Sequence, residues 1–236
     1  INQLLNSTGS WLNKSKQNEE TEKEKLKKLK RYVGKKGKHT AEYTLSKNQS
    51  VGRLYSKKIT LKDINKNARS FLVSGKCCEW DMKNASMSLL MNVCRHHDVP
   101  CPKLINFVEN RKSHIESLTE LGVKSDEAKK IWNALYMGAP FQPWLNTFGI
   151  EPPEFLSEFV AEMKVVRKRI LELAAYQKHV AAGLKSNQEK NKTNPEGSAM
   201  SFVLGDTERI VITLAVEEIQ KMGYRVNSYI FDGLMV

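Results

Sequence analysis

The sequence predicts an α+β fold, because signals for short strands lie before and after long stretches of helical periodicity in its 236 residues. Residues 228–236 read as a strand, a tight turn and a second strand, and Asp232-Gly233 is the pair favoured in a type I′ hairpin turn. Residues 77–81 read as another strand, which ends in Asp81 and leads into a helix. Together these features predict a small antiparallel sheet accompanied by many helices.

The N-terminal segment, residues 1–48, is rich in lysine and has few apolar residues. It predicts a solvated helix that ends near Gly34, followed by a loose Gly-Lys stretch. Two interpretations stay open for this segment, a solvated linker and a nucleic-acid-binding arm. Residues 51–55 then predict a short extended piece, and residues 60–73 predict a helix.

The rest of the chain is expected to be mainly helical. Residues 103–118 predict one helix, and residues 183–198 predict a polar loop. A helix over 201–222 is expected to end at Gly223, a favourable C-cap. Breaks within the helical stretch 121–182 are expected at Gly138, Pro140, Pro143 and Pro152-Pro153. We therefore divide the chain into segments 1–48, 49–120, 121–198 and 199–236.

The charge balance points to a polyanionic partner. Lys and Arg number 38 against 26 Asp and Glu, which gives a formal net charge of +12. Such an excess favours nucleic acid through counterion release, while no apolar run reaches the roughly 18 residues that a membrane span needs. The four cysteines are clustered, which suits a reducing, intracellular compartment. The chain starts without Met and stops within a strand, so we expect a fragment.

Asp81 and Asp232 are the leading candidates for chemistry. They are 151 residues apart, and each lies at the end of a predicted strand. Two Asp side chains can hold two Mg²⁺ ions, with Mn²⁺ as an alternative, because these ions prefer oxygen ligands and retain several waters. If the two strands are neighbours, the pair forms a metal site.

A second candidate lies in residues 129–138. Lys129, Asn133 and Tyr136 have the spacing of one helical face. The Lys could contact a triphosphate and the aromatic ring a base. The alternative is a buried aromatic stripe flanked by an extended Lys side chain.

The order of these features resembles motifs A, B and C of DNA polymerases with a right-hand palm. The phrases Asp-Met-Lys-Asn-Ala at 81–85, Phe-Val-Glu-Asn-Arg at 107–111 and Phe-Asp-Gly-Leu-Met-Val at 231–236 look like the divergent family A polymerases of transpovirons and virophages. The resemblance covers about residues 50–236. It implies a palm with a helical fingers insertion that acts as a template-directed DNA polymerase.

The resemblance also implies a role for each matched residue. Asp81 and Asp232 would bind the metals, and Lys129 would contact the triphosphate of the incoming dNTP. Asn133 and Tyr136 would line the nascent base pair, and Ser86 would lie where larger side chains exclude ribonucleotides. Arg53 and Arg69 are further candidate phosphate contacts, chosen for their charge near the site.

The sequence departs from the family pattern in two places. Gly233 stands where family A usually has a Glu, and the Lys-x-x-x-Asn spacing looks more like family B. The expected partners are a DNA primer-template, dNTPs and a helicase domain or subunit downstream, with no membrane. Two alternatives remain: a single-subunit RNA polymerase or primase-like synthase on the same palm, and a basic nucleic-acid-binding domain whose Asp residues are structural.

Overall fold

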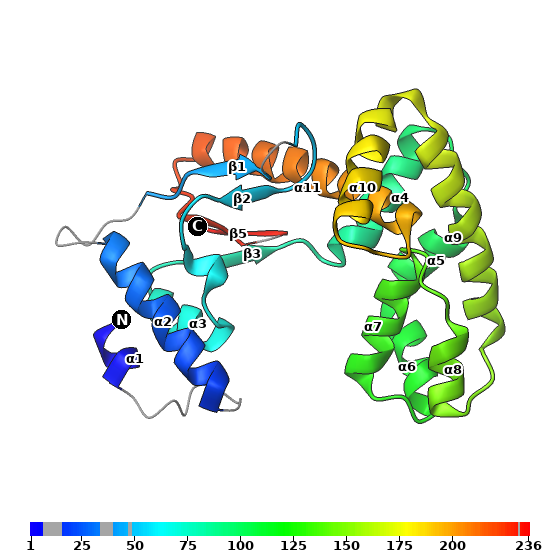
Figure 1. Cartoon of the computed structure of the whole chain (residues 1–236), viewed down its shortest axis with the longest axis horizontal. Coiled ribbons are helices and arrows are strands. Elements are labelled where there is room, and N and C mark those ends of the chain that lie inside the picture. The colour runs from blue at the N-terminus through cyan, green and yellow to red at the C-terminus, as the bar shows by residue number, and fades with distance from the viewer. Residues whose placement is uncertain (7–15, 34–39, 47–48, 231) are drawn as a thin grey trace. The chain divides into compact units, whose positions relative to one another are not determined.

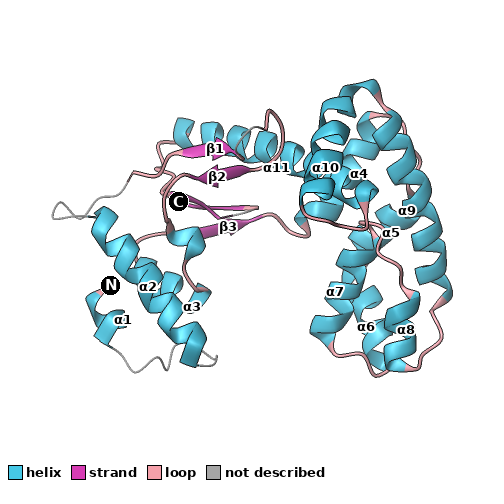
Figure 2. Ribbon diagram, in the orientation of Figure 1, coloured by secondary structure: helices cyan, strands magenta, loops and turns pink. Residues whose placement is uncertain are grey.

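The computed structural model of the chain describes residues 1–6, 16–33, 40–46, 49–230 and 232–236, and it confirms the α+β class (Figures 1 and 2). The chain forms two compact units. Unit 1 comprises residues 1–46, 54–82 and 210–236, and unit 2 comprises residues 47–53 and 83–209. The long helix α11 (Pro195–Lys221) contributes its first part to unit 2 and its last part to unit 1.

Unit 1 contains all the strands that the described residues form, together with several helices. Besides the end of α11, its elements are α1 (Asn2–Asn6), α2 (Lys16–Val33), β1 (Tyr43–Leu45), β2 (Leu54–Ser56), η1 (Leu61–Asp63), α3 (Lys66–Val73), β3 (Glu79–Asp81), β4 (Ser228–Ile230) and β5 (Gly233–Met235).

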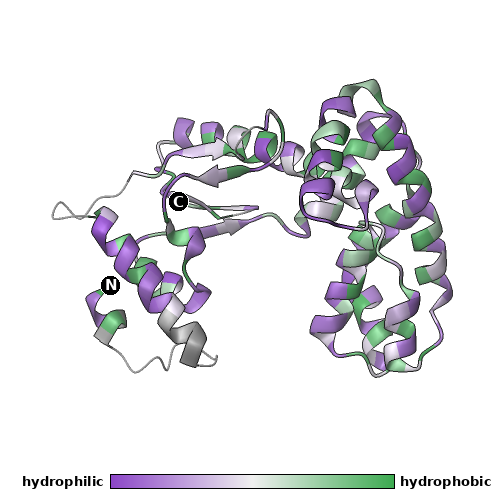
Figure 3. Cartoon of the chain, viewed as in Figure 1, coloured by the Kyte–Doolittle hydropathy of each residue, from purple (hydrophilic) through white to green (hydrophobic). Residues whose placement is uncertain are grey.

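All the regular secondary structure that the described residues of unit 2 form is helical. Its elements are α4 (Ala85–His96), α5 (Pro102–Glu109), α6 (Arg111–Glu120), α7 (Ser125–Leu135), α8 (Gln142–Phe148), α9 (Glu154–Glu172), η2 (Ala174–Tyr176), α10 (Gln177–Glu189) and the start of α11. Figure 3 shows hydrophobic and hydrophilic residues interleaved along these helices. Its core contains the buried rings of Phe107, Trp132 and Phe159, which pack against one another with centroids 4.7 to 5.5 Å apart.

The sheet that carries the acidic residues has the strand order β3-β5-β4 and is antiparallel. Cys78 and Val236 exchange two backbone hydrogen bonds of 2.8 and 2.9 Å, and Asp81 lies opposite Gly233. The pairing therefore joins residue 81 to a strand that lies about 150 residues further along the chain. A separate two-stranded sheet pairs β1 with β2, and the sequence analysis did not anticipate β1.

The C-terminal hairpin is confirmed and Asp232 lies in its turn, but the prediction that Gly233 is also a turn residue is wrong. Ile230 pairs with Gly233, so Gly233 is the first residue of β5 and not part of the turn. A Cβ on Gly233 would lie 2.5 Å from the Trp80 carbonyl oxygen. Glycine is required here because β3 and β5 approach closely, and turn conformation is not the reason.

The N-terminal basic helix is not simply a solvated linker. Leu26 and Leu29 of α2 are buried against Ile64 and Ala68, so the helix packs onto α3 and the residues before it. The helix ends at Val33, close to the predicted end at Gly34. The loose Gly-Lys stretch predicted after it falls mostly on residues 34–39, outside the described residues.

Two other secondary-structure predictions need correction. The helix expected over 103–118 is two helices, because the chain breaks at Asn110 between α5 and α6. The polar loop expected over 183–198 is mostly helix, since α10 continues to Glu189 and α11 begins at Pro195. Gly183 suggested a loop, but a Cβ there would lie 2.3 Å from the Cα of Ala199. This glycine allows two helices to touch.

The close approach at Gly183 predicts that replacing this helical glycine with alanine lowers the free energy of unfolding. Gly183→Ala should destabilise the chain by about 1–3 kcal/mol, because the added methyl group overlaps the backbone of α11. Helix propensity alone would give the opposite sign, a gain of about 0.5–1 kcal/mol. Urea unfolding of both proteins measures the difference, and a stabilised Gly183→Ala variant would show that the two helices do not touch.

Candidate functional site

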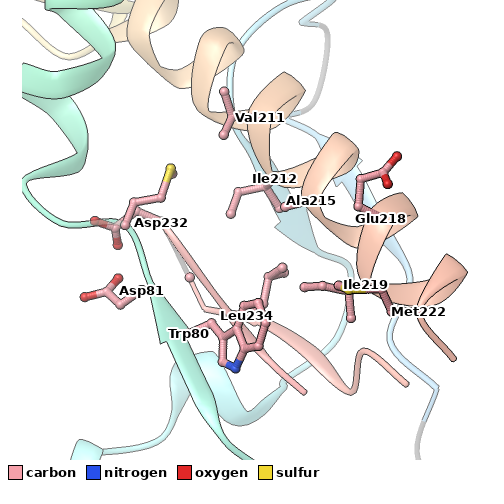
Figure 4. Close-up of a pocket in the computed structure, with 12 residues that line it drawn as sticks. Trp80, Asp81, Val211, Ile212, Ala215, Glu218, Ile219, Met222, Asp232 and Leu234 are labelled. Carbon is pink, nitrogen blue, oxygen red and sulfur yellow. The ribbon is translucent and has the colours of Figure 1, made fainter. Parts of the chain in front are cut away.

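The acidic pair lies where β3 ends and β5 begins. Asp81 is the last residue of β3, and Asp232 precedes β5 directly. The backbone N–H of Met82 donates to the carbonyl oxygen of Asp232 over 3.1 Å, which fixes the two residues beside each other. Figure 4 shows both carboxylates together at one end of a pocket. The predicted placement at the ends of neighbouring antiparallel strands is confirmed.

The two carboxylates interact electrostatically. The pKa of Asp81 is raised above its usual range, first by partial desolvation of its carboxyl group and then by the negative charges of Asp232 and Glu79. Lys66 and a hydrogen bond from the Met82 N–H act in the opposite direction and do not cancel the rise. Two like charges held together in this way store repulsion that a cation would relieve.

The donor set of this site suits a hard cation. Both side chains offer carboxylate oxygens, the ligands that Mg²⁺ and Mn²⁺ accept. Asp81 is exposed and Asp232 is half-buried, so solvent can reach the pair. Among the described residues no group of three or more His, Cys, Asp or Glu forms a metal cluster, so water and a ligand would complete the coordination.

Four residues in unit 2 form a second polar cluster, and three of them were predicted site residues. The hydroxyl groups of Tyr136 and Ser86 are hydrogen-bonded, and the charge of Arg53 acts on Tyr136. Arg53 pairs with Glu208 over 2.5 Å. Tyr136 is only 8% exposed, and burial raises its pKa. The structure therefore brings Arg53, Ser86 and Tyr136 together around a buried glutamate.

The remaining predicted residues have other surroundings. Lys129 of α7 pairs with Asp126 over 3.1 Å within the same helix. Asn133 is exposed, whereas Tyr136 is buried directly after the helix, so the predicted face does not present all three side chains to solvent. The tyrosine fits the alternative of a buried aromatic. Roles for Lys129 and Asn133 in nucleotide binding stay predictions.

Arg69 is a buried residue of unit 1, 8% exposed. Its guanidinium group donates to the Glu79 carboxylate over 3.1 Å and to the Ile64 carbonyl oxygen over 3.5 Å. Glu79 is in β3, two residues before Asp81, so this ion pair ties α3 to the strand that carries the site. These contacts make Arg69 a support for the strand.

Sequence reasoning missed an ionic network on α11. Asp206 accepts hydrogen bonds from the backbone N–H of Gly52 and from Arg209, and it lies 3.1 Å from His179. These bonds lower the pKa of Asp206 despite the opposing effect of burial. The available signal was a run of charged residues inside an otherwise apolar helix, which includes the buried Glu208. Charges in such a position need partners.

Comparison with known proteins gives one informative relative. No protein-family model matches the chain. A Sputnik virophage protein named "Putative helicase V13" is 26% identical over 197 residues, which cover 80% of this chain. The match covers 24% of the relative, so the chain spans about a quarter of the length of that protein. None of the described helices is long and apolar enough to cross a membrane.

This finding contradicts the assignment to DNA polymerases. The relative comes from a virophage, as the resemblance implied, but its name indicates a helicase. The polymerase prediction is therefore corrected, and its alternatives do not match the relative either. The physical reason is that an Asp before a helix and an Asp in a hairpin turn are locally favourable without any catalytic role. Such patterns predicted the strands correctly and the reaction wrongly.

Repulsion within the acidic pair predicts how stability responds to charge. A raised pKa means that the folded state binds the proton more tightly, so this carboxyl group costs stability once pH exceeds its folded pKa. Asp81→Asn should therefore raise the melting temperature at pH 7 in EDTA by at most about 3 °C, because solvent reaches the pair and screens the repulsion. Mg²⁺ should raise the melting temperature of the wild type and leave the variant unchanged.

Thermal unfolding with and without 5 mM Mg²⁺ measures both effects. Glu217→Gln removes an exposed acidic residue of α11 and serves as the control. A lower melting temperature for Asp81→Asn in EDTA would show that the carboxylates do not repel each other.

Proposed function

We propose that this chain engages nucleic acid as a segment of a helicase-like protein, and that Asp81 and Asp232 hold a divalent cation that contacts a phosphate group. The observation that carries the proposal is the pairing of β3 with β5, which brings two acidic residues together in a strongly basic chain. The name of the virophage relative supports the choice of nucleic acid. The proposal does not extend to dNTPs or to a primer-template.

The cation explains how an acidic pair can serve a polyanionic ligand. Two carboxylates alone repel a phosphate, whereas a bound Mg²⁺ attracts it and uses it as a further oxygen ligand. Asp81 and Asp232 would supply the protein ligands, and the bound ion would supply positive charge at the phosphate. Glu79 lies close enough to influence Asp81, but its pairing with Arg69 holds it outside this ligand set.

Basic residues elsewhere in unit 1 supply binding that does not need the cation. On α2, the buried Leu26 and Leu29 turn the opposite face to solvent. That face carries Lys27, Lys28 and Arg31, and Lys30 lies at its flank; all four are exposed. Such a group of positive charges binds phosphates without sequence preference. Its contribution to affinity falls steeply with added salt, because salt reduces the free energy gained by releasing counterions from the nucleic acid.

The two contributions predict a separable response in a binding experiment. Fluorescence anisotropy with a labelled 20-nucleotide single strand should show affinity that falls steeply between 50 and 200 mM salt and rises about tenfold with Mg²⁺ at fixed ionic strength. Asp232→Asn should remove the Mg²⁺-dependent rise, because one of the two ligands is lost. It should leave the binding measured in EDTA unchanged or slightly stronger.

Glu217→Gln, which alters an exposed acidic residue of α11, is the matched control and should retain the Mg²⁺ effect. If Mg²⁺ strengthens binding equally in the wild type and in Asp232→Asn, the cation acts elsewhere and the site assignment is wrong. If the wild type shows no measurable affinity for single-stranded or duplex DNA or RNA, the proposed function itself is wrong.

A further inference from the structure

An apolar groove of about 280 Å³ lies in unit 1 between the end of α11 and the sheet β3-β5-β4. One wall is formed by α11, and the other by side chains of β3 and β5 (Figure 4). Apart from the acidic residues named below, its principal side chains are Trp80, Val211, Ile212, Ile219, Met222 and Leu234. Trp80 is 49% exposed and Met222 is 59% exposed, so large apolar surfaces face solvent at this groove.

The groove exists because one helix does not cover the whole sheet. A helix is about 10 Å across, and neighbouring strands lie about 4.8 Å apart, so a single helix covers roughly two strands of three. Ile212, Val216 and Ile219 of α11 are buried against Leu234 of β5. The edge strand β3 receives no such cover, and all three of its residues are exposed.

The charged residues that line the groove are all acidic. They are Asp81, Asp232 and Glu218, in a chain with 38 basic and 26 acidic residues. At physiological salt, charges beyond about 8 Å are largely screened, so the local field comes from these three carboxylates and two nearby lysines. Lys221 pairs with Glu218 over 2.7 Å and Lys66 acts on Asp81, which leaves one negative charge in excess. A ligand of this groove must bury apolar side chains against its lining, and the carboxylates would repel a polyanionic ligand.

We propose that this groove binds an amphipathic, basic α-helix of a partner protein. The partner helix would lie beside α11 over β3, bury Trp80 and Met222 with its apolar side, and place lysine or arginine side chains near Glu218. A helix in a groove is a common mode of recognition, in which apolar residues at i, i+3, i+4 and i+7 provide the contact. Asp81 and Asp232 also belong to the proposed cation site, so the test below is made without divalent cations, which leaves all three carboxylates charged.

A labelled 14-residue amphipathic peptide of leucine and lysine tests the proposal by fluorescence anisotropy with the whole chain, in EDTA and 150 mM salt. The same peptide with glutamate in place of lysine is the matched probe. The lysine peptide should bind at least tenfold more tightly than the glutamate peptide. Equal binding of the two peptides would contradict the charge selection.

Two pairs of variants locate the binding surface. Met222→Lys alters the groove, while Tyr224→Lys introduces the same charge at an equally exposed residue (60%) that does not line it. Ala215→Arg obstructs the groove, while Leu214→Arg changes the adjacent exposed residue of α11, which lies outside the lining. Both groove variants should weaken peptide binding at least tenfold, and both controls should stay within twofold of the wild type.

Met222 is so exposed that its replacement should leave the fold intact. Circular dichroism checks the fold of every variant. Equal peptide affinity in groove and control variants would overturn the proposal. Sedimentation provides a second check: self-association of the chain that Met222→Lys abolishes and Tyr224→Lys preserves would assign the groove to a second copy, and would likewise overturn it.

Discussion

The antiparallel pairing of β3 with β5 is the constraint on which the candidate site depends. It joins a strand near residue 80 to the last residues of the chain, and it is secured by the reciprocal hydrogen bonds between Cys78 and Val236. Gly233 permits the close approach, because any side chain there would collide with the Trp80 carbonyl group. Without this register, Asp81 and Asp232 would not lie beside each other.

The surrounding structure supports that pairing from both sides. The last turns of α11 bury Ile212, Val216 and Ile219 against Leu234, which holds β5 in place. On β3, Arg69 pairs with Glu79 and anchors the strand to α3. The repulsion between the two aspartates is therefore imposed on them by packing and hydrogen bonds that lie outside the site. Sites that are held in this way can bind a cation without large rearrangement.

Sequence patterns predicted the elements that depend on local signals. The hairpin, the strand before Asp81 and the end of α11 near Gly223 all carry such signals, and all are present. Glycine was the least reliable guide. Gly183 was predicted to lie in a loop and Gly233 in a turn. Instead, Gly183 allows α10 to approach α11, and Gly233 allows β5 to approach β3. The pattern of a single sequence does not show such contacts between elements.

The polar network on α11 was missed for a similar reason. Asp206 interacts with Gly52 and His179, and Glu208 pairs with Arg53. Only the tertiary structure brings these partners together. The reaction could not be predicted from the sequence. The acidic pair could be predicted from two strand ends, but the reaction assigned to it rested on resemblance, and the virophage relative points to a different class of protein.

The most direct test of this account is to locate a cation by anomalous diffraction from crystals grown with Mn²⁺. If the pair binds a cation, an anomalous peak lies between the carboxylates of Asp81 and Asp232, with oxygen ligands at about 2.1 Å, and disappears in Asp232→Asn crystals. An ordered pair of aspartates without a peak between them, or a peak that persists in the variant, would contradict the assignment of these residues as a cation site.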